Sequence, residues 1–482
     1  MASTIQSPSA AVRARVDHPI IDSDGHAVEF GRALFECVAE VAGPATVDRL
    51  RRRMPTSFGG LSSRQRREQR LWRGPWWALP AENALDLATA TLPKLLYERL
   101  DEIGLDFTVL YPSMGLVFPE FEDEEIRRAA CRGANLYFAR YFGEYRDRMA
   151  PVASVPMHTP AEAIEELEYA VGVLGLRAVV MPSFVRRPVT APGSGDAEAG
   201  RPAHWIDTYC LDSEYDYDPV WTKCVELGIA PTFHSLSMGI GFRASISNYM
   251  YNHIGHFAAS GEALCKALFM GGVTRRFPTL KFAFLEGGVG WAAGLYADLI
   301  GHWEKRNVQT VQRYNPARMD RELFLSLCQR YGGELTEHRL ESRSFLLPVP
   351  DQGADLQSRD DWSHCGIKSA QDIRDLFIPH FYFGCEADDP MNANAFDTRR
   401  NPFGARLNAI FSSDIGHWDV PDMRDVTHEA YELVEEGLIS QDDFRRFVFE
   451  NPGRMWLGMN PDFFKGTKVE DATRALTAQD QP

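Results

Sequence analysis

The sequence predicts an α/β fold in which eight parallel strands close into a (β/α)8 TIM barrel, with long insertions on its C-terminal face. Eight short apolar runs alternate with helical patterns along the 482 residues, and this alternation is typical of a parallel sheet. Most of the runs are uninterrupted, as expected for strands that are covered on both faces. Barrels of this kind also tolerate insertions that carry them past about 400 residues. An open doubly wound sheet is the alternative fold.

The predicted strands are spread over most of the chain. They are residues 19–24, 107–111, 151–155, 178–181, 230–233, 282–285, 381–383 and 410–413. Helices are expected between them, because apolar residues there recur at helical spacing, as Ile164, Leu167, Val171 and Leu174 do, and as Leu264 and Leu268 do.

Three long segments exceed what a bare barrel needs. They are residues 29–91, 191–217 and 299–379, and they follow the first, fourth and sixth predicted strands. Insertions at the carboxyl ends of barrel strands emerge on the catalytic face, where long ordered loops often cover a binding site. The barrel itself is expected over residues 18–464, after an N-terminal extension (1–17) and before a polar tail (465–482) that we expect to fray.

Composition and charge restrict the class of protein. The chain is 44% hydrophobic and 24% charged, as in ordinary soluble proteins, and its net charge of -16 disfavours nucleic acid as a partner. Its eight cysteines include no C-x-x-C pair, which favours scattered reduced thiols over a disulfide framework. We see no signal peptide and no apolar run long enough to span a membrane. The expectation is a cytoplasmic protein with no membrane partner.

Acidic and histidine residues stand at the ends of five predicted strands. Strand one ends with Asp24 and His26, which alternation places on one face, so both can reach the same ion. The fifth, sixth, seventh and eighth strands end with His234, Glu286, Glu386 and Asp414. Parallel strands end at one rim, so these side chains should converge on a divalent metal such as Zn, Mn or Fe. Singly, the aspartates could instead cap helices, the histidines could be supporting polar groups, and the glutamates could pair with arginines.

A sixth ligand could come from the segment between residues 252 and 256. His256 lies there three residues after His253, and it is either a further ligand or a helix cap or buried polar contact. The candidate ligands are then Asp24, His26, His234, His256, Glu286 and Asp414. Six ligands are more than one zinc requires, so two metal ions are plausible.

These runs resemble the amidohydrolase-related (amidohydrolase 2) family over about residues 18 to 460. The resemblance rests on Asp22-Ser-Asp-Gly-His26, His234, Phe284-Leu-Glu-Gly-Gly-Val-Gly-Trp291 and Ser413-Asp414. The family holds its metal with a strand-one H-x-H pair, a strand-five histidine and a strand-eight aspartate. The resemblance therefore implies Asp24 and His26 at the first pair, with His234 and Asp414 as the remaining ligands.

Two departures from the family pattern matter. Glu286 stands where many relatives have a strand-six histidine, and residues 178–183 contain no lysine for a carboxylated-lysine bridge. Because Asp24 stands in place of the first strand-one histidine and Glu286 in place of the strand-six histidine, the chain looks similar to a branch of non-heme di-iron monooxygenases that act on coenzyme A thioesters in diterpenoid biosynthesis. The leading expectation is thus a monooxygenase with two Fe that hydroxylates a small carboxylic acid or its thioester. The first and third insertions are expected to close over the substrate and exclude water.

The rival expectation is an amidohydrolase or non-oxidative decarboxylase with Zn or Mn. In it Glu286 or Glu386 acts as the general acid or base. A non-enzymatic binding module is a third possibility. The resemblance and the long insertions also suggest a homodimer. Arginines between Arg49 and Arg73 in the first insertion either form a solvated or subunit-contact face or clamp an anionic substrate such as a coenzyme A phosphate.

Overall fold

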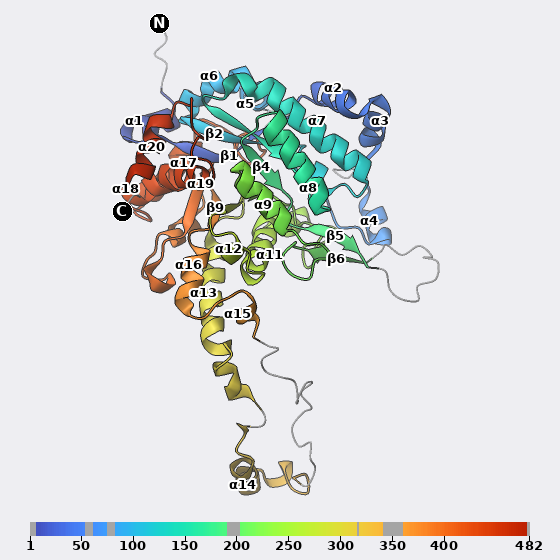
Figure 1. Cartoon of the computed structure of the whole chain (residues 1–482), viewed down its shortest axis with the longest axis vertical. Coiled ribbons are helices and arrows are strands. Elements are labelled where there is room, and N and C mark those ends of the chain that lie inside the picture. Colours follow the sequence, from blue (N-terminus) through green and yellow to red (C-terminus); the bar gives the residue numbers. More distant parts are fainter. Residues whose placement is uncertain are drawn as a thin grey trace.

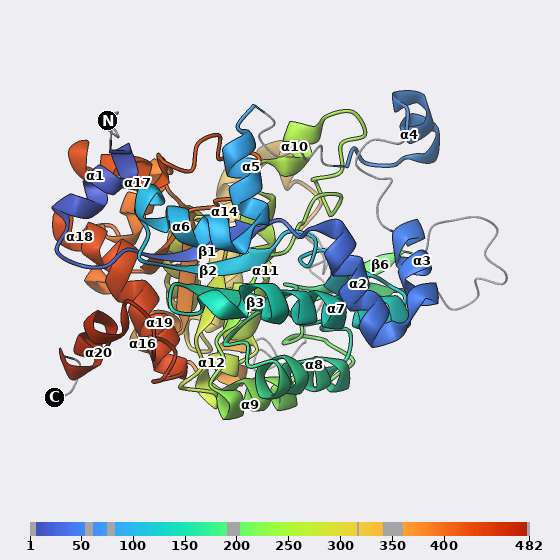
Figure 2. The same cartoon turned by 90° about the horizontal axis from the view of Figure 1, so that it is seen from above.

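The barrel predicted from the sequence is confirmed by the fold (Figures 1 and 2). The protein is seen as a computed structural model that describes residues 6–53, 61–74, 82–189, 203–315, 318–340 and 360–479. Eight strands pair in parallel in the order β1-β2-β3-β4-β7-β8-β9-β10. Their bounds are β1 Ile21–Ala27, β2 Phe107–Pro112, β3 Met149–Ser154, β4 Ala178–Met181, β7 Pro231–Phe233, β8 Phe282–Phe284, β9 Phe381–Glu386 and β10 Asn408–Ser412.

The first and last strands meet and close the sheet. The Asp414 N–H donates to the carbonyl of Asp24 at 3.0 Å, and the His26 N–H donates to the carbonyl of Ile415 at 2.7 Å. These bonds lie where β1 and β10 end, so the residues that follow both strands are neighbours. Closure therefore brings Asp24, His26 and Asp414 together although they lie far apart in the sequence.

Aromatic side chains pack around the middle strands. The ring centroid of Phe284 lies 5.7 Å from that of Phe233 and 6.1 Å from that of Phe383, and all three side chains are buried. Strands enclosed in this way read as continuous apolar runs, which is why the sequence locates them.

Helices surround the sheet (Figures 1 and 2). The helices between and after the barrel strands are α6 Pro93–Ile103, α7 Glu124–Phe142, α8 Pro160–Leu167, α9 Asp218–Leu227, α10 Tyr249–His253, α11 His256–Met270, α12 Val273–Arg276, α13 Gly290–Arg306, α16 Ala370–Phe377, α17 Val426–Glu435, α18 Gln441–Arg445 and α19 Asn451–Met459. The helical spacing that begins at Ile164 continues past α8 as a π-helix over Glu168–Val173.

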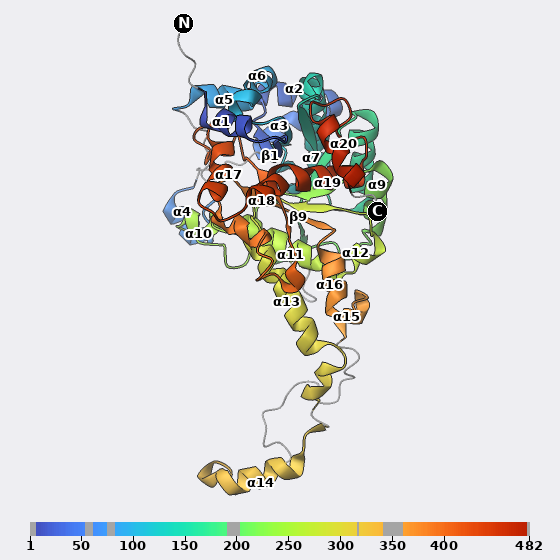
Figure 3. The ribbon, with the colours of Figure 1, turned by 90° about the vertical axis from the view of Figure 1, so that its left-hand side faces the viewer.

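The three insertions form separate structures. The first contains α2 Gly31–Ala42, α3 Pro44–Arg53, α4 Ser63–Gln69 and α5 Ala84–Thr91, and the second includes a hairpin of β5 Val185–Pro188 and β6 His204–Asp207. The third continues from α13 through a short helix over Thr310–Tyr314 to α14 Arg321–Tyr331, and returns through α15 Asp361–His364. Figures 1 and 3 show α14 at the tip of an arm that leads away from the barrel. The expectation that this insertion closes over the centre is therefore wrong for its described residues.

Both ends of the described chain pack on the barrel. Helix α1 (Pro8–Arg15) buries Val12, and helix α20 (Glu470–Gln479) packs on α19 and buries Leu476. The expectation that the tail frays is thus wrong for α20, because its few apolar residues face the barrel. The domain limits at residues 18 and 464 stay a prediction.

All eight cysteines are unpaired. No helix among the described residues has the length and apolar character that crossing a membrane requires.

Candidate metal centre

The carboxyl end of β1 is fixed by a buried carboxylate. Asp22 is fully buried and accepts hydrogen bonds from the hydroxyls of Thr108 at 2.6 Å and Ser413 at 2.8 Å. It also accepts from the N–H groups of Ser413 at 2.9 Å and Asp24 at 3.1 Å. These four bonds tie β1 to β2 and to the residue after β10. Asp22 therefore positions the candidate ligands without belonging to them.

An irregularity in β1 then turns the chain between Asp22 and Gly25. A Cβ at Gly25 would lie 2.6 Å from the Asp22 carboxylate and 2.7 Å from the Thr108 hydroxyl, so only glycine fits there. The shift lets β1 continue past Gly25 to His26.

One group of candidate ligands consists of Asp24, His26 and His234, whose ligand atoms all lie within 4.8 Å of one another. His26 Nε2 is 3.4 Å from Asp24 Oδ1, and His234 Nε2 is 3.9 Å from Asp24 Oδ2. All three side chains are buried. Donor atoms at such separations can share one ion, because metal–ligand bonds are about 2 Å long.

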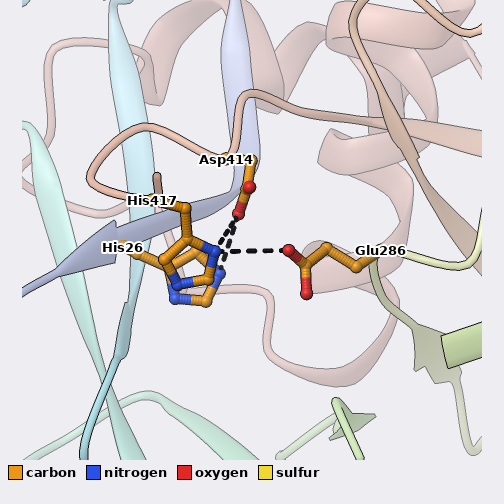
Figure 4. A group of neighbouring side chains, drawn as sticks. All are labelled: His26, Glu286, Asp414 and His417. Atoms are coloured by element: carbon orange, nitrogen blue, oxygen red, sulfur yellow. Dashed lines mark hydrogen bonds and ion pairs between the residues drawn. The ribbon is translucent and has the colours of Figure 1, made fainter. Parts of the chain in front are cut away.

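The second group consists of His26, Glu286, Asp414 and His417 (Figure 4). Asp414 Oδ1 lies 3.3 Å from His26 Nε2 and 2.6 Å from His417 Nδ1. Glu286 Oε1 lies 3.2 Å from His417 Nδ1. The rings of His26 and His417 stack with centroids 3.5 Å apart. Since His26 belongs to both groups, they form one continuous centre at the mouth of the barrel.

The buried polar atoms of the centre fit a cation. Both carboxylate oxygens of Asp24, both ring nitrogens of His26 and Nδ1 of His234 have no hydrogen-bond partner among the described residues. Glu286 Oε2 and Asp414 Oδ1 face the imidazoles of His234 and His417, at 2.9 and 2.6 Å. Leaving so many polar atoms buried without partners is costly, and a divalent ion would satisfy them. The mixture of imidazoles and carboxylates suits Zn, Mn or Fe. The residues present thus could hold one or two metal ions.

Two of these residues have strained backbones. Glu286 and Asp414 adopt φ values of 53° and 52°, in the left-handed region that residues other than glycine rarely occupy. Strained residues cluster at functional sites, where the surroundings hold them in place. Each turn directs its carboxylate into the centre instead of continuing the strand.

Burial and mutual charge shift the titration of the centre. Burial, reinforced by the charge of Glu286, raises the pKa of both Asp24 and Asp414 well above the ordinary value. Burial alone would lower the pKa of His234, but the charges of Glu286 and Asp24 raise it to about 9. Burial opposes ionisation of Glu286, yet His234 and His417 hold its pKa well below normal. Without a cation the aspartates thus retain protons, which metal binding would release.

Five of the six predicted ligands lie together in these two groups. His256 belongs to neither, and it lines an adjoining cavity instead. Sequence analysis did not include His417 among the ligands, although it lies three residues after Asp414 and the Asp-x-x-His spacing was available as a signal. Whether any of these residues ligates a metal stays a prediction.

The adjoining cavity has a volume of about 330 Å³ and opens beside the second group. Its walls are His253, Ile254, Gly255, His256, Phe257, Ala258, Glu286, Gly287, Gly288, Glu386, Asp389 and Asp419. Desolvation by these walls and the charge of Glu286 raise the pKa of Glu386 to about 8. A carboxyl group with this pKa is mostly protonated at neutral pH and half-protonated near pH 8, so it can serve as a general acid or base in that range.

The first insertion contacts the segment that precedes the cavity wall in the sequence. The N–H of Arg73 donates to the carbonyl of Ser245 at 2.8 Å, and the amide of Asn252 donates to the carbonyl of Arg73 at 2.9 Å. The Trp72 ring packs closely on Gly239: it lies 2.4 Å from the position that a Cβ on this glycine would take. No described arginine of this insertion lines the cavity, and Arg49 instead pairs with Asp123 at 2.8 Å. The proposal that arginines of this insertion clamp an anionic substrate stays a prediction, because none of their described contacts supports it.

Comparison with known proteins gives one family match. The family model described as "Amidohydrolase" matches residues 93–316. A search of curated proteins by sequence gave no match. A solved structure named amidohydrolase II is 12% identical and has a TM-score of 0.50, with 91% of this chain and 99% of that chain covered. At this identity the similarity shows a shared barrel fold.

Two further solved structures have lower TM-scores. An amidohydrolase from Mycobacterium avium subsp. paratuberculosis is 15% identical at a TM-score of 0.49, covering 92% of this chain and 100% of that chain. The 5-carboxyvanillate decarboxylase of Sphingomonas paucimobilis is 13% identical at a TM-score of 0.47, with 91% of this chain and 98% of that chain covered.

Proposed function

We propose that this chain is a divalent-metal-dependent enzyme that performs non-redox chemistry on a small substrate: hydrolysis of a C–N or C–O bond, or decarboxylation. The observation that carries the proposal is the pair of buried His and carboxylate groups that share His26 and open on a cavity at the mouth of the barrel. The match to the amidohydrolase family model over residues 93–316 supports the same class.

The side chains divide into holding and reacting groups. The side chains that would hold the metal are Asp24, His26, His234, Asp414 and His417. Glu286 lies between the two groups and contacts both His234 and His417. A bound divalent cation supplies polarisation of a substrate carbonyl or a lowered pKa of bound water.

Glu386 is the acid or base of the proposed reaction. It lines the cavity next to Glu286, and its pKa of about 8 leaves it partly protonated near neutral pH. In hydrolysis its proton goes to the leaving atom, and in decarboxylation to the carbon that loses carbon dioxide. Tyr111 packs against two of these histidines, because its ring lies beside those of His26 and His234. A 3.0 Å hydrogen bond from its hydroxyl to Thr232 holds the ring in place.

A dinuclear iron oxygenase is the second candidate. One observation favours it: Glu286 reaches both groups, with Oε2 at 2.9 Å from His234 Nε2 and Oε1 at 3.2 Å from His417 Nδ1. A carboxylate that spans two ligand sets is a feature of di-iron carboxylate sites in other folds. No comparison supports iron, so the monooxygenase, its two Fe and its thioester substrate stay predictions.

Metal analysis tests the proposal. We expect protein purified without chelator to hold one or two equivalents of Zn or Mn per chain, and Asp24→Ala and Asp414→Ala to lose them. The variant His428→Ala, a surface histidine, serves as the control. Anaerobic turnover of an amide, ester or aromatic acid panel should then follow metal content. Two Fe per chain with oxygen uptake would select the second candidate. Metal-free protein with intact function would refute both and leave a binding module.

A further inference from the structure

The cavity beside the centre has an unusual charge. Among its twelve wall residues are the carboxylates Glu286, Glu386, Asp389 and Asp419, and none is lysine or arginine. Arg243 is not part of the wall, although its guanidinium lies 3.4 Å from where a Cβ on the wall residue Gly255 would be. His234 and His417 pair with Glu286, whereas Glu386, Asp389 and Asp419 face no lysine or arginine in the cavity wall.

The outer carboxylates are available to a ligand. Asp419 is exposed to the cavity and has no hydrogen bond or ion pair in the described part of the chain. Asp389 uses Oδ1 to cap the Met391 N–H at 2.8 Å, while Oδ2 points toward Gly288, 2.9 Å from where a Cβ would be. Both acids therefore present an oxygen without a counter-charge.

A buried histidine in the same wall also lacks a partner. His256 is 1% exposed, and neither of its ring nitrogens makes a hydrogen bond to any residue that the structure describes. Its ring lies 4.7 Å from that of His253, centroid to centroid. Burial lowers the pKa of His256 to about 3, so the imidazole is neutral and offers an acceptor nitrogen. A buried group of this kind without a partner points to a ligand that supplies one.

A further metal ion is a poor occupant. Among the described residues, His256, Asp389 and Asp419 belong to no group of three or more ligand atoms within 4.8 Å. These acceptors are too dispersed for one small ion, and they suit an organic cation with several N–H donors spread over more space.

We propose that the outer half of this cavity binds a positively charged ammonium or amidinium group of the substrate, held by Asp419, Asp389 and His256. The inference rests on the proposed function, since it assigns the substrate class of the same site. It departs from the small acid or thioester expected from the sequence. The reacting, oxygen-bearing end of the substrate faces the metal, and the cationic end faces outward.

Binding of small probes to the metal-loaded protein tests this. Benzylammonium and its neutral analogue benzyl alcohol are compared by calorimetry at pH 7, with benzoate as a probe of the metal itself. We expect benzylammonium to bind at least tenfold more tightly than the alcohol. Asp419→Asn should weaken benzylammonium about tenfold and leave benzoate unchanged. Asp388→Asn is the matched control, because it removes the same charge from an exposed residue outside the cavity wall.

The outcomes separate this inference from the proposed function. Equal affinity for benzylammonium and benzyl alcohol, or equal effects of Asp419→Asn and Asp388→Asn, would overturn the cation site while metal content stays intact. An additional equivalent of Mn²⁺ that Asp419→Asn removes would also overturn it, in favour of a metal. Loss of metal from the wild-type protein would instead count against the proposed function.

Discussion

At the scale of single residues, the centre is a set of buried polar groups whose burial a divalent cation would compensate. Asp24 and Asp414 are almost completely buried, and His26 Nε2 lies 3.4 Å from the one and 3.3 Å from the other without a hydrogen-bond partner among the described residues. A structural role alone would have given these atoms hydrogen bonds, as Asp22 has. The contrast between Asp22 and Asp24, two residues apart, separates a positioning carboxylate from a candidate ligand.

Glu386 gives the first prediction. If its protonated form acts as the acid, kcat/KM should fall as pH rises through about 8, because the group then loses its proton. Glu386→Gln should lower kcat/KM by about 10²–10⁴-fold and abolish that limb of the pH profile. Steady-state rates from pH 6 to 10 provide the measurement.

The control for this prediction is Asp388→Asn, which should keep the limb but move it to lower pH, because the Asp388 charge contributes to the raised pKa of Glu386. A profile for Glu386→Gln that retains the wild-type limb near pH 8 would show that another group titrates there. Metal content is measured in the same samples, so that loss of metal is not mistaken for loss of the acid.

The sequence predicts the position of a site residue well where a strand end determines it, and poorly where a turn or a helix start determines it. Asp24, His26 and His234 stand at or beside strand ends, so topology alone brings them together. His417 comes after a turn in which Asp414 adopts a positive φ, and strand alternation does not reach across such a turn. His256 begins α11 and faces the cavity instead of the centre.

At the scale of elements, Asp22 joins β1, β2 and the end of β10. Asp22→Ala would leave up to four buried donors without an acceptor, each at a cost of about 1–3 kcal/mol unless it finds another partner. We expect a loss of at least about 2 kcal/mol in the free energy of unfolding, measured by urea titration. Ser413→Ala, which removes one donor, should cost less. Equal stabilities of Asp22→Ala and wild type would contradict this role.

Gly25 gives a prediction on the same strand. A methyl group there would lie 2.6 Å from the Asp22 carboxylate and 3.2 Å from Ile415, so Gly25→Ala must displace β1. We expect a cost of about 1–3 kcal/mol in stability together with weaker metal binding, because Asp24 and His26 flank the glycine. The control Gly294→Ala lies in α13 with no atom within 4 Å of the new Cβ, and it should stabilise the helix by up to about 1 kcal/mol. Unchanged metal affinity in Gly25→Ala would show that the strand adjusts freely.

The elements differ in how far the sequence could predict them. All eight barrel strands were located, because buried parallel strands read as apolar runs. The arm that carries α14 was expected over the centre, but sequence position after a barrel strand does not give the direction of an insertion. Helix α20 was expected to fray, because two buried residues, Val469 and Leu476, are too few to dominate a polar segment.

At the scale of the whole molecule, stability should depend on buried neutral histidines. His380 is 2% exposed, its Nδ1 lies 2.7 Å from the carbonyl oxygen of Leu280, and burial lowers its pKa to about 4. The unfolded chain binds this proton near pH 6.5, so folding stability is complete above that pH and falls as pH drops toward 4. The loss should approach about 3 kcal/mol for this residue, since each pKa unit corresponds to about 1.4 kcal/mol.

Urea unfolding at pH 6.5, 5.5 and 4.5 provides the measurement. His158 and His256, with pKa values of about 3, add losses of the same sign. His380→Gln should therefore flatten the wild-type slope in part, whatever its effect on stability at pH 7. If His380→Gln does not change the slope of unfolding free energy against pH, His380 has the same pKa in the folded and the unfolded protein.

The barrel sets where chemistry can occur, and it does not set which chemistry occurs. The same mouth accommodates hydrolysis, decarboxylation or oxygen chemistry, and the choice depends on the ion and on the cavity walls. The predicted homodimer stays a prediction, which sedimentation velocity of the full chain can test. No described residue of the arm in Figure 3 lines the cavity or belongs to either ligand group.

The most direct test of the account is anomalous X-ray diffraction from crystals of protein purified without chelator, recorded on both sides of the Zn, Mn and Fe absorption edges. We predict an anomalous peak among His26, His234 and Asp414, about 2 Å from their donor atoms. The absence of any peak there, in crystals of protein that is catalytically active, would contradict the claim that these residues bind a metal.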